Sequence, residues 1–158
     1  MNAKMPELKS CFESAGFTEV RTVLSSGNVV FTARAVAPGS LERRAEEAMR
    51  SSLGRSFGTI VRSTEFLRSM IETDPFAGFN FPSEAKKVVT FLRHPVESAL
   101  ELPIERDGAR ILKLDDTEAF SVYVPSDKGP AFMYLLERTF GKDITTRTLD
   151  TVKKCALA

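Results

Sequence analysis

The same order of predicted elements occurs twice along this chain, and this repetition restricts the fold more than any single motif does. In the first half, apolar residues at helical spacing alternate with short runs rich in β-branched residues. Prolines, glycines and serines separate these runs, as turn and capping residues do. The elements they predict are helix 6–15, strands 20–24 and 28–33, a helix that starts at Ser40 and stops at Gly54, strand 59–62, and a helix that Pro75 ends.

The second half repeats this order and adds one strand in front. Its predicted elements are strand 87–93, helix 95–102, strands 109–114 and 119–124, helix 130–140, strand 144–147, and a helix capped by Thr148. A βαββαβ unit is the ferredoxin-like arrangement. The sequence therefore predicts an α+β protein with two ferredoxin-like α/β subdomains, of which the first lacks its opening strand. We place the first (αββαβα) at residues 1–76, a connection at 77–86, and the second (βαββαβα) at 87–158.

Two strands carry apolar residues at successive positions. They are Val29-Val30-Phe31 in the first half and Val88-Val89 with Phe91-Leu92 in the second. A sheet with one face in water should alternate apolar and polar residues instead. We therefore expect both faces to be at least partly covered here, by helices on one side and another subdomain or chain on the other.

The first half has only residues 1–5 in front of its first helix, where a complete unit would have a strand. In a ferredoxin-like unit the opening strand lies between two others, so its loss would leave unpaired backbone groups. Three arrangements would satisfy them. The remaining strands close up in another order, a strand from another chain fills the gap in a homodimer, or the native start lies upstream.

Charge and cysteine content bear on partners and compartment. Lys and Arg number 22 against 21 for Asp and Glu, a net charge of +1, which argues against nucleic acid as a partner. Polar residues interrupt residues 1–20, and apolar runs stay far below the roughly 18 residues that a membrane span needs. Two cysteines make no disulfide framework. We expect a soluble cytoplasmic protein without a membrane partner.

The residue types that most often perform catalysis stand apart from one another. His94, the single histidine, has no cysteine or serine next to it that it would activate. Cys11 lies on the apolar helix face, and Cys155 lies near the chain end, positions typical of unreactive thiols. Asp115, Asp116 and Glu118 lack calcium-loop spacing. We predict no catalytic residue, metal site or cofactor, and the sequence favours a non-enzyme over an enzyme.

The turn Ser26-Gly27-Asn28 is the best candidate for ligand binding in the sequence. Its backbone N–H groups could hold an anion, although Gly27 and Asn28 also suit a purely structural turn, which is the commoner role. Arg62 and Arg147 each end a predicted strand and could hold a phosphate or pair with surface carboxylates. These five residues form the predicted anion or ligand site.

Three aromatic residues, Phe76, Phe79 and Phe81, crowd an uncharged connection with two prolines and a glycine. Aromatic residues in such loops usually pack on a core. If they are exposed instead, they mark a contact surface for a partner.

Residues 5–31 read MPELKSCFESAGFTEVRTVLSSGNVVF, and this run resembles the DUF1697 family of bacterial proteins. There a K-M-x-E-L helix leads through a G-F-x-x-V-x-T hairpin to a Q-S-G-N-V-V-F strand, and Ser25 replaces the glutamine. Further matches cover essentially the whole chain: Val61-Arg62-Ser63, Pro75-Phe76, residues 89–92, Leu136-Glu137-Arg138 with Gly141, and Arg147 with Thr151-Val152.

The chain departs from the family pattern at three places. An opening strand with a turn like L-R-G-I-N-V-G-G has no counterpart, Pro130 to Met133 follow Lys128-Gly129 where the family often has G-R-S-K, and Arg147-Thr148-Leu149 replaces R-N-W. The resemblance implies two α/β subdomains and a bacterial cytosolic setting. It implies no reaction, because the family's own activity is undefined.

Three functional hypotheses follow. The first is a noncatalytic binding module that uses the sheet surfaces or the groove between the halves to hold a small molecule. The second is a small enzyme or binder for a phosphorylated or nucleotide-like metabolite, with the turn and the two arginines holding the anion. The third, RNA binding, rests on the ferredoxin-like topology alone, and topology does not confer function.

Overall fold

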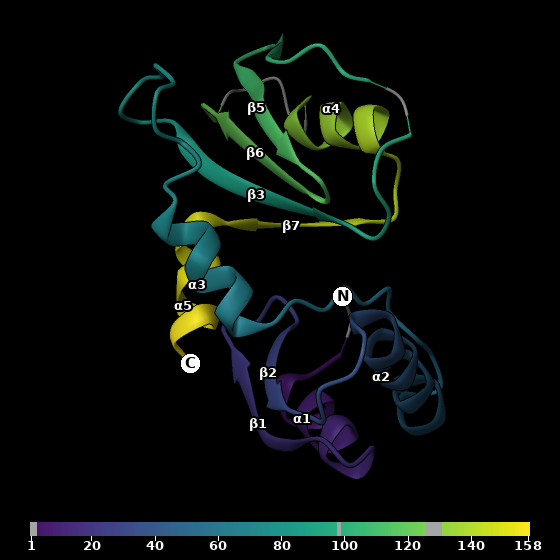
Figure 1. Ribbon diagram of the computed structural model, residues 1–158. Coiled ribbons are helices and arrows are strands. Elements are labelled where there is room, and N and C mark those ends of the chain that lie inside the picture. Colours follow the sequence, from purple (N-terminus) through teal and green to yellow (C-terminus); the bar gives the residue numbers. More distant parts are fainter. Residues whose placement is uncertain (1–2, 98, 126–130) are drawn as a thin grey trace. The chain divides into compact units, whose positions relative to one another are not determined.

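The computed structural model describes residues 3–97, 99–125 and 131–158 and shows a mixed arrangement of helices and strands (Figure 1). The chain divides into two units, Met1–Arg68 with Lys153–Ala158 and Ser69–Val152. The elements are α1 (Met5–Ser14), β1 (Thr18–Val23), β2 (Asn28–Thr32), α2 (Pro38–Leu53), α3 (Thr64–Glu72), β3 (Lys86–Leu92), β4 (Ile104–Arg106), β5 (Ala109–Asp115), β6 (Glu118–Tyr123), α4 (Ala131–Phe140), β7 (Ile144–Thr148) and α5 (Leu149–Leu157). The predicted α+β class is confirmed.

The first unit is built around a hairpin and two helices. β1 and β2 pair antiparallel, and the core contains the buried faces of α1 and α2, among them Leu8, Ala45 and Met49. An aromatic cluster completes it: the ring of Phe31 lies 5.7 Å from that of Phe12 and 4.5 Å from that of Phe17. Aromatic rings tilted at this spacing attract each other, and this attraction adds to the free energy gained by burying their surface.

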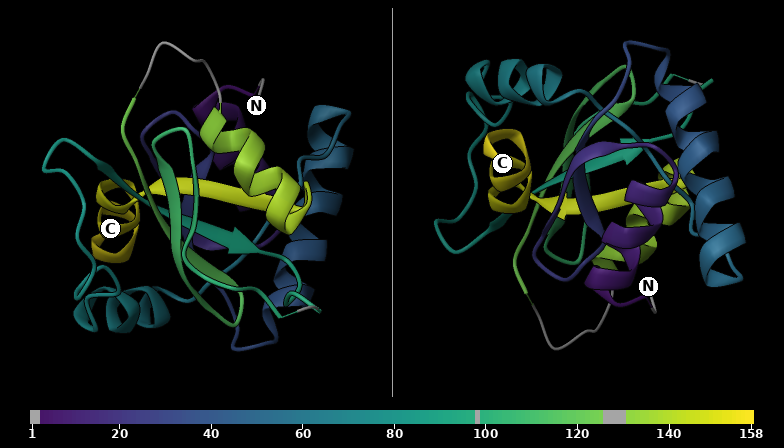
Figure 2. Two further views of the ribbon diagram at one scale, coloured as in Figure 1. Left: turned by 90° about the horizontal axis from the view of Figure 1, so that it is seen from above. Right: turned by 90° about the horizontal axis from the view of Figure 1, so that it is seen from below.

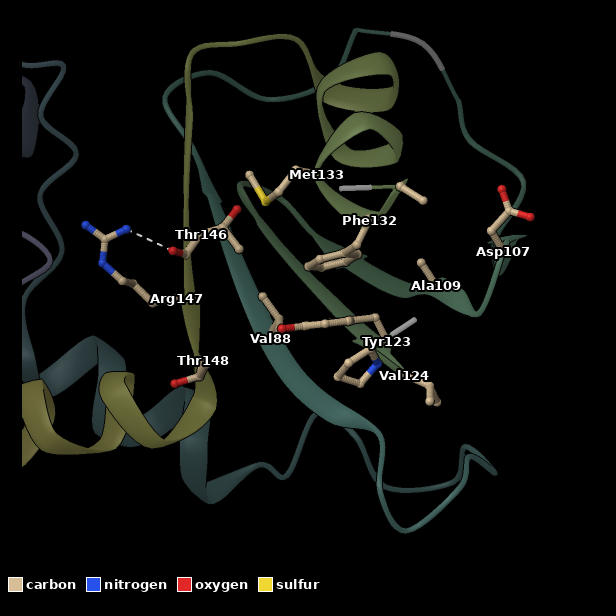
Figure 3. Close-up of a pocket in the computed structure, with 12 residues that line it drawn as sticks. Val88, Asp107, Ala109, Tyr123, Val124, Phe132, Met133, Thr146, Arg147 and Thr148 are labelled. Carbon is tan, nitrogen blue, oxygen red and sulfur yellow. Dashed lines mark hydrogen bonds between the residues drawn. The ribbon is translucent and has the colours of Figure 1, made fainter. Parts of the chain in front are cut away.

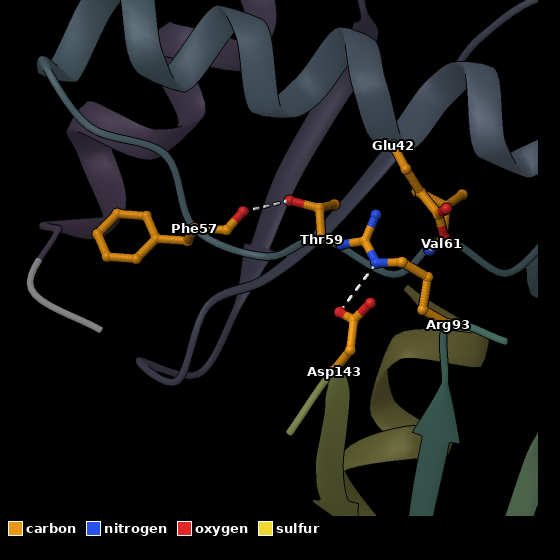
Figure 4. Close-up of polar contacts among 6 residues, drawn as sticks. All are labelled: Glu42, Phe57, Thr59, Val61, Arg93 and Asp143. Atoms are coloured by element: carbon orange, nitrogen blue, oxygen red, sulfur yellow. Dashed lines mark hydrogen bonds and ion pairs between the residues drawn. The ribbon is translucent and has the colours of Figure 1, made fainter. Parts of the chain in front are cut away.

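Residues 59–62 are not a strand, so this element of the sequence prediction is wrong. Their backbone bonds to a helix side chain instead of a neighbouring strand: Val61 N donates to Glu42 Oε2 at 2.8 Å (Figure 4). Thr59 Oγ1 donates to Phe57 O at 3.0 Å. Glu42, on α2, is only 7% exposed. β-Branched residues favour strands, but a strand also needs a neighbouring strand to pair with. Here the Glu42 carboxylate accepts the Val61 N–H instead of a neighbouring strand.

Glu42→Ala is expected to lower the free energy of unfolding by about 1.5–3 kcal/mol, because the change leaves the Val61 N–H without its charged acceptor. Glu47→Ala is the matched control, since Glu47 is exposed on the same helix, and its effect should stay within about 0.5 kcal/mol. Urea unfolding followed by circular dichroism measures both. Equal losses in the two variants would contradict the assigned bond.

The second unit contains a five-stranded antiparallel sheet with the strand order β4-β5-β6-β3-β7. β3 is the first strand of the predicted unit and lies between β6 and β7, as the ferredoxin-like arrangement requires. β4 adds an edge strand that the sequence analysis missed.

The helix predicted at 95–102 is wrong. Residue 98 lies outside the described residues, and the other seven are not helical. Pro103 disfavours helical geometry at Leu102, and the remaining stretch amounts to two turns at most, too short to be stable without a well-packed face. The chain instead turns into β4, where Ile104 pairs with Ile111.

β3 is buried on both faces, as its apolar run predicts. Val88, Val89, Phe91 and Leu92 are all buried, and so is Thr90 between them. On one face α4 lies across the sheet and contributes Leu135 and Leu136 to a shared core (Figure 2). On the other face, the Phe76 ring meets that of Phe120 edge-on, with centroids 5.8 Å apart.

The predicted cap at Thr148 is confirmed, because its Oγ1 accepts from Thr151 N at 3.3 Å at the start of α5. At the start of α3, Ser63 Oγ accepts from Phe66 N at 3.0 Å. The predicted start of the second helix at Ser40 is wrong, because α2 begins at Pro38. Pro130 of the predicted helix 130–140 lies outside the described residues. The division into 1–76, 77–86 and 87–158 stays a prediction. Within the described part of the chain, no helix has the length and apolarity to span a bilayer.

Candidate functional site

A pocket opens in the second unit between α4, β7 and the sheet face that α4 covers (Figure 3). Its volume is about 360 Å³. Strands supply the floor, the first turn of α4 supplies one wall, and β7 and the β4–β5 turn supply the two ends. The lining residues are Val88, Asp107, Ala109, Tyr123, Val124, Pro125, Ala131, Phe132, Met133, Thr146, Arg147 and Thr148.

A stacked aromatic pair stands in the middle of this pocket. The rings of Tyr123 and Phe132 are 4.6 Å apart and 14° from parallel. In Figure 3 the pair lies between Thr146 on one side and Asp107 on the other, with Val88 next to the Tyr123 ring. Because Tyr123 ends β6 and Phe132 begins α4, the strand register and the helix start together fix the stack.

Polar groups are found at the two ends. At the β7 end, Thr146 Oγ1 and Thr90 Oγ1 are 3.3 Å apart, and Thr148 Oγ1 and Thr151 Oγ1 are 3.0 Å apart. At the other end, the Asp107 side chain is 43% exposed, and its Oδ2 lies 3.9 Å from Arg106 Nε. An apolar floor with a few polar groups at the ends is typical of small-molecule sites.

Arg147 was predicted as an anion holder, and the structure places it at the edge of this pocket. Its Nη1 donates to Thr145 Oγ1 and to Thr146 O, both at 2.8 Å. Figure 3 shows its guanidinium pointing away from the aromatic pair. These bonds run to residues of the same strand, β7, and a role for Arg147 in holding an anion stays a prediction.

Ser26, Gly27 and Asn28 come together in the turn between β1 and β2. Asn28 Nδ2 donates to Val23 O at 3.0 Å and to Ser26 Oγ at 2.9 Å, and Gly27 has a φ of 87° that favours glycine. These bonds fix the turn, which is the structural role considered above. A ligand role for these three residues stays a prediction.

Arg62 belongs to the first unit and Arg147 to the second. Arg62 is half-buried, and its Nη1 donates to Val61 O at 2.9 Å. Its proposed binding of an anion also stays a prediction.

Of the three connection phenylalanines, Phe76 is in the core and 3% exposed, as is usual for such loops, while Phe79 and Phe81 are half-buried. Lys87 Nζ lies 5.8 Å from the Phe76 ring centre and 5.9 Å from that of Phe81. Cation–π attraction at these distances helps to hold the connection on β3. Contact of Phe79 and Phe81 with a partner stays a prediction.

The candidate catalytic groups remain apart. His94 is exposed in the loop after β3 and lines a separate pocket with Glu97 and Asp143. Asp143 Oδ1 accepts from Arg93 Nε at 3.0 Å (Figure 4), which ties this loop to the start of β7. In the part of the chain that the structure describes, no group of three His, Cys, Asp or Glu residues is placed to hold a metal ion.

Burial raises the pKa of the Cys11 thiol above its usual value, although a hydrogen bond with Ser52 lowers it in part. A thiol is reactive as its thiolate, so Cys11 should react with Ellman's reagent more slowly than the partly exposed Cys155. Cys11→Ala and Cys155→Ala, each leaving one thiol, separate the two rates.

The same shift predicts a pH dependence. Above about pH 8.5 the Cys11 thiol ionises more readily in the unfolded chain than in the folded one. The free energy of unfolding should therefore fall as pH rises, and it should fall less in Cys11→Ala. Faster labelling of Cys11 than of Cys155 in the native protein would contradict the buried placement.

Comparison with protein families gives a match to the family described as protein of unknown function (DUF1697), over residues 1–120. The chain belongs to the DUF1697 family. Its fold is similar to that of the conserved bacterial protein SP0830 from Streptococcus pneumoniae, with a TM-score of 0.69 and 19% identity, over 99% of this chain and 88% of that one. No curated protein matches.

The pocket of this DUF1697 member was not predicted from its sequence. Helical spacing places Phe132 on one face with Leu135, Leu136 and Phe140, a pattern typical of core residues, and Tyr123 is one residue of a predicted strand. The available signal was a tyrosine at the end of one element and a phenylalanine at the start of the next. These two positions indicate a stacked pair only when the strand register is known.

Proposed function

We propose that this DUF1697 protein is a noncatalytic binding module and that its small-molecule site is the pocket between α4 and the sheet. The observation that carries the proposal is the stacked pair Tyr123–Phe132 within a pocket of about 360 Å³. Sites for small molecules commonly measure about 300–1,000 Å³ and combine apolar walls with a few polar groups.

A binding role fits the lining better than a catalytic one. Asp107 is the one carboxylate among the described lining residues, and it is exposed to water. The hydroxyls of Thr146 and Thr148 bond to other threonines rather than to a base. A nucleophile needs a base within hydrogen-bonding distance, and the described lining offers no such pair.

The setting we propose is the bacterial cytosol. Neither Cys11 nor Cys155 is in a disulfide bond, and a structural relative is a conserved bacterial protein. RNA binding receives less support, because the aromatic residues Phe91 and Phe120 of the two central strands are 7% and 1% exposed. RNA-binding sheets of this topology stack bases on aromatic residues at their surface.

The two tyrosines of the chain make the proposal testable without a label. The sequence has no tryptophan and two tyrosines, Tyr123 in the pocket and Tyr134, 55% exposed on α4. Tyr134→Phe leaves Tyr123 as the fluorophore, and Tyr123→Phe leaves Tyr134 while keeping the ring that a ligand would contact. The probe is benzyl alcohol, with tyrosine excited where benzyl alcohol does not absorb.

We expect benzyl alcohol to change the emission of Tyr134→Phe in a saturable way and to leave that of Tyr123→Phe unchanged. Native circular dichroism spectra of both variants serve as the control for folding. An equal response from both variants, or none from Tyr134→Phe up to the solubility limit of the probe, would overturn the proposal.

A further inference from the structure

Hydroxyl groups gather at the β7 end of the pocket. Thr146 and Thr148 line it from β7, and Val88 on β3 pairs with Thr148 across the floor. Figure 3 shows the Tyr123 ring directed from the end of β6 toward Val88, with its hydroxyl at that end of the ring. The strand register therefore brings tyrosine and threonine hydroxyls to the same end of an aromatic pocket.

The Thr146 hydroxyl keeps hydrogen-bonding capacity after its bond to Thr90. The two Oγ1 atoms are 3.3 Å apart, and Thr90 is fully buried. A hydroxyl carries a donor O–H and two acceptor lone pairs. If Thr146 donates to Thr90 it keeps both lone pairs, and if it accepts from Thr90 it keeps its O–H. In either case this hydroxyl can bond to a ligand.

Tyr123 contributes a hydroxyl whose position is fixed before a ligand arrives. Its ring stacks on that of Phe132 with the ring centres 4.6 Å apart, and this stack restricts rotation of the tyrosine side chain. A phenolic hydroxyl both donates and accepts hydrogen bonds. Because the group is already in place, binding to it loses little side-chain entropy.

From these observations we infer that the pocket takes an aromatic ligand that carries a hydroxyl group. The ligand ring lies beside the Tyr123–Phe132 pair, and its hydroxyl lies at the β7 end, within reach of Tyr123 Oη and Thr146 Oγ1. This inference rests on the proposed function and names the ligand class of the same site. It makes Tyr123 and Thr146 the residues that determine specificity.

Benzyl alcohol and ethylbenzene test the ligand class, because they have nearly the same shape and differ by a hydroxyl in place of a methyl group. A pocket that leaves the hydroxyl unpaired would favour ethylbenzene by about tenfold or more, since burial of an unpaired hydroxyl is costly. We expect benzyl alcohol to bind at least as tightly as ethylbenzene. Backbone amide shifts in NMR spectra of the isotope-labelled protein give both dissociation constants without use of the Tyr123 fluorescence.

Substitutions that remove a hydroxyl locate the effect. Tyr123→Phe keeps the stacked ring and should shift the preference toward ethylbenzene by about threefold to tenfold. Tyr134→Phe is the matched control: it removes the same hydroxyl from a residue that is 55% exposed on α4 and does not line this pocket, and the preference should not change. Thr146→Val should shift the preference in the same direction as Tyr123→Phe, and Thr146→Ser, which keeps the hydroxyl, should not.

The outcomes separate the two claims. If both probes shift the amides of Val88, Tyr123 and Phe132 but ethylbenzene binds tenfold more tightly, the ligand class is wrong while the site remains. Equal changes of preference in Tyr123→Phe and Tyr134→Phe would overturn the inferred role of Tyr123. If neither probe shifts these amides up to its solubility limit, the proposed function fails and this inference fails with it.

Discussion

Phe120→Ala is expected to lower the free energy of unfolding by about 3–5 kcal/mol, as truncation of a buried aromatic residue usually does. Phe120 is 1% exposed, stands on the central strand β6 and meets the Phe76 ring edge-on. Phe120 packs between the sheet and the connection that carries Phe76. The surrounding residues can therefore relax only a little into the cavity that the change leaves. A loss of this size is a large fraction of the stability of an ordinary domain.

Urea unfolding of the wild type and the variant measures this effect. Phe66→Ala removes the same side chain from a position that is 40% exposed on α3 and is the matched control, with an expected loss below about 1 kcal/mol. Similar losses for the two variants would mean that Phe120 is not the buried centre of the second unit.

Phe132→Ala is expected to weaken binding of benzyl alcohol by at least about tenfold, equivalent to about 1.4 kcal/mol. The change removes the ring that stacks on Tyr123 and forms one wall of the pocket. A ligand then loses an aromatic face, and Tyr123 loses the neighbour that holds its ring in place.

Phe140→Ala is the control on the same helix. Phe140 packs on the α4 core but does not line this pocket, so its truncation should cost stability and leave the affinity within about twofold, or roughly 0.4 kcal/mol. The fluorescence titration is carried out in the Tyr134→Phe background. A larger loss of affinity in Phe140→Ala than in Phe132→Ala would contradict the assigned wall.

Much of the fold follows from local patterns in the sequence. Helix 6–15, both hairpins and the last two helices are found close to their predicted positions, because their apolar spacing agrees with their turns and caps. The apolar run Val88–Leu92 also predicted burial on both faces correctly.

The errors arise where a distant partner decides the local structure. Residues 59–62 have strand composition, yet Glu42, about twenty positions away, accepts their N–H. Residues 95–102 have a helical pattern, yet the chain continues into an edge strand that Ile111 pairs with. Neither partner can be identified from the local sequence.

The candidate pocket was harder to predict from the sequence than the fold. Sequence reasoning selects residues whose type suggests chemistry, such as Asn28 and Arg147, and the structure shows both side chains bonded to nearby backbone. Tyr123 and Phe132 are ordinary core residues by type. What distinguishes them is the place where β6 ends and α4 begins, and this is a property of the tertiary structure.

The central claim is that the pocket between α4 and the sheet is where this protein binds small molecules. Its most direct test is a titration of the isotope-labelled protein with benzyl alcohol, followed through backbone amide shifts in NMR spectra. The account predicts saturable shifts at Val88, Tyr123, Phe132 and Thr146, and none at Ser26 to Asn28 or Arg62. Shifts that centre on the β1–β2 turn or Arg62 and leave Tyr123 and Phe132 unmoved would contradict it.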